Sequence, residues 1–408
     1  MTLATSAAGQ APPLEPDPLV CVDGSKVEDA AGWTGKRRGE LLELFRREMY
    51  GAAPPPRALA VEARESGPAL GGAAVRKQWR LRYGDGQAQG VEVLAYLPAP
   101  KAGAVRAPTP VFLALNFQGN HTVSADPEVR VASCWVRNNP ALKVKDHRAT
   151  AASRGGVQER WPVAALVARG YGLITACYGD IDPDFDDGFE NGVHGALEPP
   201  SEGPRRDDAW GSIGAWAWGL SRILDSLEAD PDVDARRVAV LGHSRLGKTA
   251  LWAGAQDERF WMVLSNNSGC GGAAYSRRRE GETVAAITKR FPHWFCRTFR
   301  SYADREDALP LDQHLLLALC APRPVYVASA EKDAWADPLG EFLSARGADS
   351  VYRLLCGDGL PATSQPALDV SSQGRIGYHL RAGKHDLLLA DWVHYMDFAD
   401  RHRGLRDR

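Results

Sequence analysis

One serine of this 408-residue chain lies where its hydroxyl could act as a nucleophile. The apolar run 238–241 predicts a strand, Gly-His-Ser-Arg follows at 242–245, and a helical pattern begins at once. This strand–turn–helix sequence is typical of a nucleophile elbow, whose sharp turn exposes the serine hydroxyl. Ser244 is therefore the predicted nucleophile. The usual G-x-S-x-G spacing is broken, because Leu246 stands where the second glycine is expected and the glycine falls at Gly247.

A serine nucleophile needs a base, and the base needs a carboxylate that fixes its tautomer. Behind a nucleophile elbow the chain order is serine, acid, histidine. The apolar strand predicted at 324–330 is followed by Asp333 and Asp337. We favour Asp333 as the acid because it lies in the turn directly after the strand. Asp337 precedes Pro338 and resembles a helix cap.

Two histidines precede the last predicted helix, His379 and His385. We favour His385 as the general base, because Gly383 gives its loop conformational freedom just before the helix begins. His379 remains the alternative. His243, next to the serine, is expected to pack beneath the turn.

The transition state of acyl transfer carries an oxyanion that needs donors. The backbone N–H of Arg245, at the start of the helix, is the expected first half of the oxyanion hole, and its guanidinium could add a charged donor. The second half should come from the loop around Gln118, Gly119 and Asn120. The alternative for Arg245 is a surface ion pair.

These residues need a scaffold, and the pattern of apolar runs predicts one. Strands buried on both faces are expected to alternate with helices, which implies a mostly parallel sheet with right-handed crossovers. The predicted architecture is the α/β-hydrolase fold, a three-layer α/β/α sandwich. The strands are expected at 111–116, 171–178, 236–241, 262–266 and 324–330, and the helices at 159–169, 212–228, 247–256 and from about 388. A helix at 37–49 and antiparallel strands at 75–83 and 91–97 are expected to precede them.

The chain is expected to form one catalytic domain, residues 21–408, behind a flexible Ala/Pro-rich arm, residues 1–20. Two insertions, near 119–158 and 179–211, interrupt the alternation. Both follow carboxyl ends of strands, where open α/β sheets bind their ligands. They are expected to wall the substrate groove.

Composition excludes several function classes. The formal net charge of −2 offers no basic field for nucleic acid, and no apolar run approaches the roughly 20 residues of a membrane helix. The seven cysteines include no CxxC pair, so zinc-site spacing is absent; one disulfide could form, with partners that the sequence does not name. The first residues as written have no signal-peptide pattern, which leaves a cytoplasmic location or a removed signal.

The segment GHSRLGKTALWAG (242–254) resembles the G-[C/H]-S-R-x-G-K motif of the glucuronoyl esterases, carbohydrate esterase family 15. The resemblance implies an α/β-hydrolase that uses an acyl-enzyme to cleave esters between 4-O-methyl-glucuronic acid of glucuronoxylan and lignin alcohols. It implies no metal, no cofactor and a secreted or periplasmic location, and we expect a monomer. Further stretches carry the resemblance at 115–121, 160–181, 265–282, 309–338 and 376–392.

The resemblance also implies residue roles. Ser244 and His385 match the nucleophile and the base, and Arg245 matches the oxyanion arginine. Lys248, Glu282 and Trp335 match residues that contact the sugar. Fungal members place the acid after strand six, at the position of Asn267 here. Because an amide carries no charge, the acid is expected to be Asp333, as in many bacterial members.

Two other functions stay open at this point. One is an acetyl-xylan esterase, or another esterase of small acyl groups, on the same fold. The other is a pseudoenzyme that binds glucuronoxylan without cutting it. The complete set of Ser244, Asp333 and His385 argues against a pure binding protein, which has no need of a nucleophile elbow.

Overall fold

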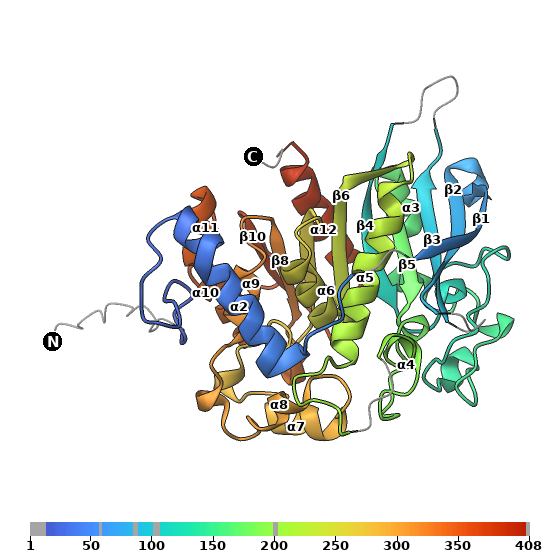
Figure 1. The fold of residues 1–408 in the computed structure, drawn as a ribbon. Coiled ribbons are helices and arrows are strands. Elements are labelled where there is room, and N and C mark those ends of the chain that lie inside the picture. The colour runs from blue at the N-terminus through green and yellow to red at the C-terminus, as the bar shows by residue number, and fades with distance from the viewer. Residues whose placement is uncertain (1–13, 57–58, 85–88, 101–106, 199–202, 405–408) are drawn as a thin grey trace.

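A ten-stranded sheet forms the centre of the computed structural model, which describes residues 14–56, 59–84, 89–100, 107–198 and 203–404 (Figure 1). The strand order is β1-β2-β3-β5-β4-β6-β7-β8-β10-β9. The strands are β1 Ala60–Ala69, β2 Ala74–Arg82, β3 Gly90–Pro98, β4 Thr109–Asn116, β5 Gly172–Cys177, β6 Val233–His243, β7 Met262–Asn266, β8 Val325–Ala330, β9 Ser371–Gln373 and β10 Ile376–Arg381.

The six neighbouring strands β5, β4, β6, β7, β8 and β10 are parallel to one another. At one edge β1, β2 and β3 pair antiparallel, and at the other edge β9 pairs antiparallel with β10. The central strands β4, β5, β7 and β8 are buried along their whole length, as their continuous apolar sequences predict. All the predicted strands occur. The sequence analysis did not identify β1, β9 and β10, and β10 leads into the loop that carries His385.

Helices cover both faces of the sheet, and each face has its own apolar core (Figure 1). One core contains side chains of α2 Arg38–Phe45, α5 Ser212–Glu228, α6 Arg245–Gln256, α9 Gln313–Ala318, α10 Pro338–Gly347 and α11 Asp349–Cys356. The opposite core contains side chains of α3 Val163–Ala168 and α12 Leu389–His402. The predicted three-layer α/β/α sandwich is confirmed.

Shorter helices lie in the connections. They are α1 Ala30–Gly32, α4 Gly192–Leu197, α7 Val284–Arg290 and α8 Arg297–Arg300, of which α4, α7 and α8 gather near one end of the molecule (Figure 1). The two predicted insertions follow β4 and β5. Apart from α4, the described parts of these insertions contain only single 3₁₀ turns and isolated β-bridges.

The described part of the N-terminal arm, residues 14–20, contacts the domain. The carbonyl of Pro16 accepts a hydrogen bond from Nε2 of His314 at 2.7 Å, and that of Pro18 accepts one from Nε of Arg37 at 3.1 Å. The rest of the predicted arm lies outside the described residues. All seven cysteines are free thiols. Among the helices in the described part of the chain, none has both the length and the apolar character needed to cross a bilayer.

Candidate active site

Ser244 occupies the sharp turn between β6 and α6. Its backbone has φ 58° and ψ −129°, a left-handed conformation that a residue with a side chain adopts only where the surroundings enforce it. Two hydrogen bonds hold the turn: the Ser244 N–H donates to the Asn266 carbonyl at 2.9 Å, and the Gly247 N–H donates to the Ser244 carbonyl at 2.8 Å. The turn has the conformation of a nucleophile elbow.

The unusual glycine spacing has a steric explanation. A Cβ at position 242 would lie 1.8 Å from the carbonyl oxygen of Leu246, so only glycine fits before the turn. A Cβ at position 247 would lie 2.9 Å from the Cβ of Ser268. Leu246 itself is buried in the core below the turn. The close approach after the serine therefore falls one residue later than in the usual motif, at Gly247.

Ser244, Arg245 and His385 line one cavity of about 180 Å³. In the described part of the chain, the hydroxyl of Ser244 and the imidazole of His385 are not hydrogen-bonded to each other. Such contacts often form only when a ligand closes the site. The other lining residues are Phe117, Gln118, Arg137, Arg160, Tyr178 and His243.

Asp333 and His385 form a hydrogen bond of 2.5 Å between Oδ2 and Nδ1. Asn267 donates a second hydrogen bond, from Nδ2, to the same carboxylate oxygen at 2.9 Å. Burial acts to raise the pKa of Asp333, but the hydrogen bond and the charge of His385 outweigh it, so the pKa is lowered and the carboxylate stays ionised. A carboxylate on Nδ1 leaves Nε2 of His385 as the nitrogen that can accept a proton.

The two alternative residues of the sequence analysis have other contacts. Asp337 caps α10, where it accepts the Gly340 N–H at 3.0 Å, and it pairs with Arg278 at 2.8 Å. His379 is fully buried between the hydroxyl of Tyr326 and the carboxylate of Asp391, at 3.0 and 2.9 Å. Neither residue lines the cavity.

The loop that carries His385 is held from below by Arg381. This buried guanidinium donates to the carbonyls of Lys384 and Asp386, at 2.8 and 2.5 Å. Gly383 has φ 101°, which glycine alone adopts easily, as expected for this loop. The loop therefore presents His385, whose side chain is 42% exposed, over a fixed support.

His243 is buried as expected, and it also contacts the predicted base. Its ring centroid lies 4.6 Å from that of His385. Asn266 donates from Nδ2 to the Tyr395 hydroxyl at 2.8 Å, so its Oδ1 accepts from Nδ1 of His243 at 2.6 Å. Burial first, and the charge of His385 second, lower the pKa of His243 well below its usual value. His243 is thus a neutral ring that packs against the base.

The guanidinium of Arg245 is bound by a buried carboxylate, Asp184, and is not part of a surface ion pair. Burial acts to raise the pKa of Asp184, but hydrogen bonds and the charge of Arg245 lower it to about 2. The sequence analysis missed Asp184, because five aspartates occur between residues 180 and 187 and nothing in the sequence separates them. Asp184 also binds His293 at 3.0 Å, Trp294 at 2.7 Å, Arg137 at 3.0 Å and Tyr178 at 3.1 Å.

Of the three residues predicted for the second half of the oxyanion hole, Gln118 remains the candidate. The N–H of Gly119 donates to Oδ1 of Asn116 at 2.8 Å. The side-chain amide of Asn120 donates to the carbonyl of Glu92, also at 2.8 Å. Only Gln118 of the three lines the cavity.

Lys248, Glu282 and Trp335 form a second cluster. Lys248 donates to the carbonyl of Ser268, and its Nζ lies 4.0 Å from the carboxylate of Glu282. Burial lowers the pKa of Lys248, and the charge of Glu282 opposes that shift. The N–H of Glu282 donates to the carbonyl of Trp335 at 2.9 Å, and Trp335 is 52% exposed.

Trp294 connects this cluster to Arg245. Its ring centroid lies 6.0 Å from Nζ of Lys248 and 4.6 Å from Cζ of Arg245. A charged side chain over an aromatic face is attracted by the ring quadrupole. The indole of Trp294 therefore contacts one member of each predicted group, Arg245 beside Ser244 and Lys248 beside Glu282.

The fold and this site define a carboxylic ester hydrolase of the α/β-hydrolase class. A family profile described as "Glucuronyl esterase, fungi" matches residues 205–356. The chain is 50% identical over 390 residues to "Carbohydrate esterase MZ0003" from an unknown prokaryotic organism. This alignment covers 95% of this chain and 89% of that protein.

Two solved bacterial structures are similar over almost the whole chain. A CE15 esterase from a marine bacterial metagenome, described as promiscuous, has 49% identity and a TM-score of 0.89, and covers 97% of this chain and 98% of its own. A glucuronoyl esterase from Solibacter usitatus has 44% identity and a TM-score of 0.90, and covers 98% and 100%. The chain belongs to carbohydrate esterase family 15, the glucuronoyl esterases, as a bacterial-type member.

Proposed function

We propose that this protein hydrolyses the ester between 4-O-methyl-glucuronic acid of glucuronoxylan and lignin alcohols, with Ser244, His385 and Asp333 as its catalytic triad. The observation that carries the proposal is the 2.5 Å hydrogen bond between Asp333 and His385, beside a serine in an elbow conformation that lines the same cavity as the histidine. The membership of the family supports the choice of a glucuronate ester.

In the first half of the reaction, Nε2 of His385 takes the proton of Ser244 as its oxygen attacks the uronoyl carbonyl. The carbonyl oxygen becomes an oxyanion next to the backbone N–H of Arg245 at the start of α6, where the helix dipole also favours negative charge. His385 then gives its proton to the departing alcohol. Asp333 stabilises the imidazolium that exists between these two transfers.

In the second half, water attacks the carbonyl of the acyl-enzyme while His385 takes a proton from that water. The bond to the Ser244 oxygen then breaks, and His385 returns the proton to this oxygen. The product is a glucuronate anion. The guanidinium of Arg245 is held at the cavity by Asp184 and favours the charge that grows on the carboxyl end. Because Asp184 already pairs with this cation, the site does not bury an isolated charge.

Lys248 and Glu282 are proposed to bind the hydroxyls of the glucuronate ring, and Trp335 to cover its apolar face. One buried donor and one buried acceptor, with Nζ and the carboxylate 4.0 Å apart, match vicinal sugar hydroxyls, which both donate and accept. The exposed indole of Trp335 suits a sugar face with C–H bonds. We further propose a monomer that acts outside the cytoplasm, on polymeric plant material.

The experiment is hydrolysis of benzyl and methyl glucuronate by the wild-type protein and Ser244→Ala, beside the matching galacturonate and acetyl esters. Loss of the nucleophile should lower kcat by roughly 10⁶-fold. Ser301→Ala, at an exposed serine, is the matched control. Retained activity in Ser244→Ala would refute the nucleophile. Faster cleavage of acetyl esters would favour an acetyl-xylan esterase, and no labelling by a fluorophosphonate probe would favour a binding protein.

A further inference from the structure

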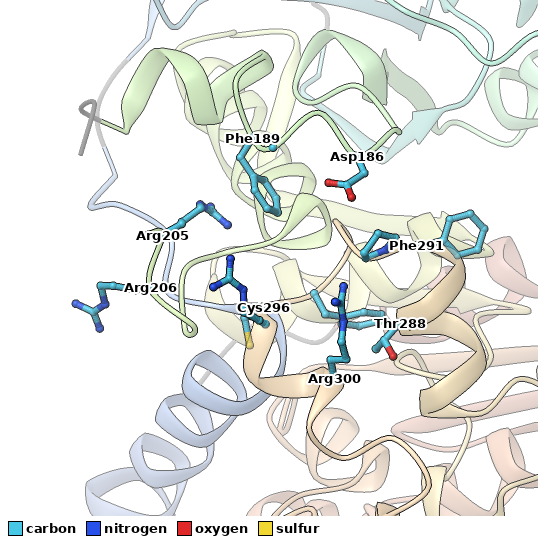
Figure 2. A pocket seen from close by; sticks show the side chains of 12 residues that line it. Asp186, Phe189, Arg205, Arg206, Thr288, Phe291, Cys296 and Arg300 are labelled. Carbon is cyan, nitrogen blue, oxygen red and sulfur yellow. The ribbon is translucent and has the colours of Figure 1, made fainter. Parts of the chain in front are cut away.

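A second pocket, of about 290 Å³, lies between the insertion after β5 and the helices α7 and α8 (Figure 2). Figure 2 shows Asp186 and Phe189 reaching into it from the insertion, with Thr288 and Arg300 on the opposite side. A shallower depression of about 460 Å³ shares Asp186, Thr288 and Arg300 with this pocket and continues to Lys289. The two together form a groove with room for more than one sugar ring.

The pocket is lined by four arginines and one carboxylate, Asp186. Arg205 is the most fixed of the four: it pairs with Glu198 at 2.6 Å and its Cζ lies 3.7 Å from the ring centroid of Phe189. Arg300 is exposed, and among the described residues its guanidinium has no hydrogen bond or ion pair. The other two pair at the surface, Arg206 with Asp208 at 2.5 Å and Arg297 with Asp207 at 3.4 Å.

Surface ion pairs of this kind are weak, so an incoming anion displaces their carboxylates at little cost. Arg300 needs no displacement at all. The cationic side of the pocket therefore favours a carboxylate. Asp186 disfavours one on its own side, but it can accept hydrogen bonds from hydroxyls, and the hydroxyl of Thr288 can donate or accept. A ring with one carboxylate and several hydroxyls meets both requirements.

The pocket and the candidate active site lie on either side of one chain segment, residues 291–296. His293 and Trp294 bind Asp184, which holds Arg245. Their neighbours Phe291, Pro292, Phe295 and Cys296 line the pocket. Phe291 also belongs to the network, because its ring stacks on that of Trp294 at 3.7 Å and its centroid lies 5.3 Å from Cζ of Arg245. A ligand in the pocket is therefore separated from the Arg245 network by the thickness of a single segment.

We propose that this pocket binds a free, unesterified glucuronate side group of the same polymer whose esterified glucuronate occupies the site at Ser244. The proposal rests on the proposed function and extends it to the polymer. Glucuronoxylan carries a carboxylate on every glucuronate that is not esterified, so the polymer around a scissile ester is an anion. The pocket recognises that charge, whereas the ester itself is neutral.

The test compares three substrates: benzyl glucuronate, fully methyl-esterified glucuronoxylan, and the same polymer with part of its glucuronates free. The wild-type protein should have a higher kcat/KM for the partly free polymer. Arg300→Glu should remove that preference, through an increase in KM of about 5-fold or more that 0.5 M NaCl mimics in the wild type. Arg300→Lys should keep most of it, because the charge remains.

Arg236→Glu is the matched control, since the Arg236 side chain is 92% exposed and lines neither the pocket nor the candidate active site. All variants should hydrolyse benzyl glucuronate within about 2-fold of the wild type, which shows that they are folded. If the wild type cleaves benzyl glucuronate but prefers neither polymer, or if Arg300→Glu keeps the preference, the inference is wrong and the proposed function stands. If the wild type does not cleave benzyl glucuronate, the proposed function itself fails.

Discussion

Asn267 donates a hydrogen bond from Nδ2 to Oδ2 of Asp333 at 2.9 Å, onto the oxygen that also binds His385. Asn267 follows β7, at the position where the resemblance to fungal members places the acid, whereas Asp333 follows β8. The amide therefore does not replace the carboxylate. It supports a carboxylate that reaches the same histidine from the neighbouring strand.

This arrangement predicts a moderate effect of Asn267→Ala. The variant keeps the contact between Asp333 and His385 but loses a donor that holds the carboxylate in place. A hydrogen bond to a charged group contributes roughly 1.5 to 3 kcal/mol, so kcat should fall by about 10- to 100-fold with KM unchanged. Steady-state kinetics on benzyl glucuronate measure this.

The substitution Asn267→Asp distinguishes support from replacement. A second carboxylate beside Asp333 replaces a donor by a like charge, so activity should fall further than in Asn267→Ala. An Asn267→Asp variant as active as the wild type would mean that either position can supply the acid.

The choice between Asp333 and Asp337 gives a second prediction. In Asp333→Asn the amide cannot stabilise the imidazolium or fix the tautomer, and kcat should fall by roughly 10⁴-fold. Asp337→Asn should keep kcat, because this residue caps α10 and pairs with Arg278. Asn caps a helix about as well as Asp, so the variant should lose only the ion pair with Arg278, which is worth up to about 1 kcal/mol of unfolding free energy. Steady-state kinetics and urea unfolding of both variants check this. If Asp337→Asn were the inactive variant, the roles of the two aspartates would have to be exchanged.

The sequence predicted the elements of the site that depend on local pattern. Strand β6, the turn at Ser244 and helix α6 follow from periodicity and glycine positions in one short stretch. Asp333 follows from its place after a buried strand. Each of these features depends on a residue and its neighbours in the same strand, turn or helix, and such local patterns can be recognised in a single sequence.

The residues that the sequence missed act through contacts between distant segments. Asp184 and Arg245 are far apart in the chain, and the network of Asp184 also draws on residues 137, 293 and 294. Strand β10 was missed because its sequence, Ile376–Arg381, includes the buried polar residues His379 and Arg381 and is therefore no continuous apolar run. Their burial follows from Asp391 on α12, which no local pattern relates to them.

Asp184→Asn gives the third prediction. The variant leaves Arg245 at the cavity without its carboxylate, so the guanidinium is free to move away from the developing charge. Loss of one such stabilising group costs about 10²- to 10³-fold in kcat, and breaking a buried charge pair costs about 3 to 5 kcal/mol of stability. Asp23→Asn, in an exposed ion pair with Lys36 at 2.6 Å, is the control; it should leave kcat unchanged and alter stability little, because exposed ion pairs are weak. Unaltered kinetics in folded Asp184→Asn would remove Arg245 from the proposed mechanism.

Glu341 gives the last prediction, on the dependence of stability on pH. This carboxyl is fully buried on α10 behind Asp333, and it accepts from the N–H groups of Ser268 and Gly269 at 2.7 and 3.0 Å, and from the Ser329 hydroxyl at 2.6 Å. Burial, the largest cause, raises its pKa from 4.5 to about 7. The folded protein therefore holds a proton on Glu341 between these two values, whereas the unfolded chain has released it.

Where the folded state binds more protons, stability falls as pH rises. The contribution of Glu341 is thus complete below pH 4.5 and is lost as pH rises through about 7. The whole change is on the order of 3 kcal/mol, at 1.36 kcal/mol for each pKa unit.

The variant Glu341→Gln tests this prediction, because its side chain cannot titrate, yet its amide oxygen can accept the same N–H bonds. Burial also raises the pKa of Asp180 and Asp182, to about 7 and about 6, so the wild-type slope contains their contributions as well. The measurement is therefore the difference in unfolding free energy between the wild type and Glu341→Gln at pH 5 and pH 8, which should shift in favour of the variant at the higher pH. An equal difference at both values would mean that Glu341 is ionised in the folded protein throughout.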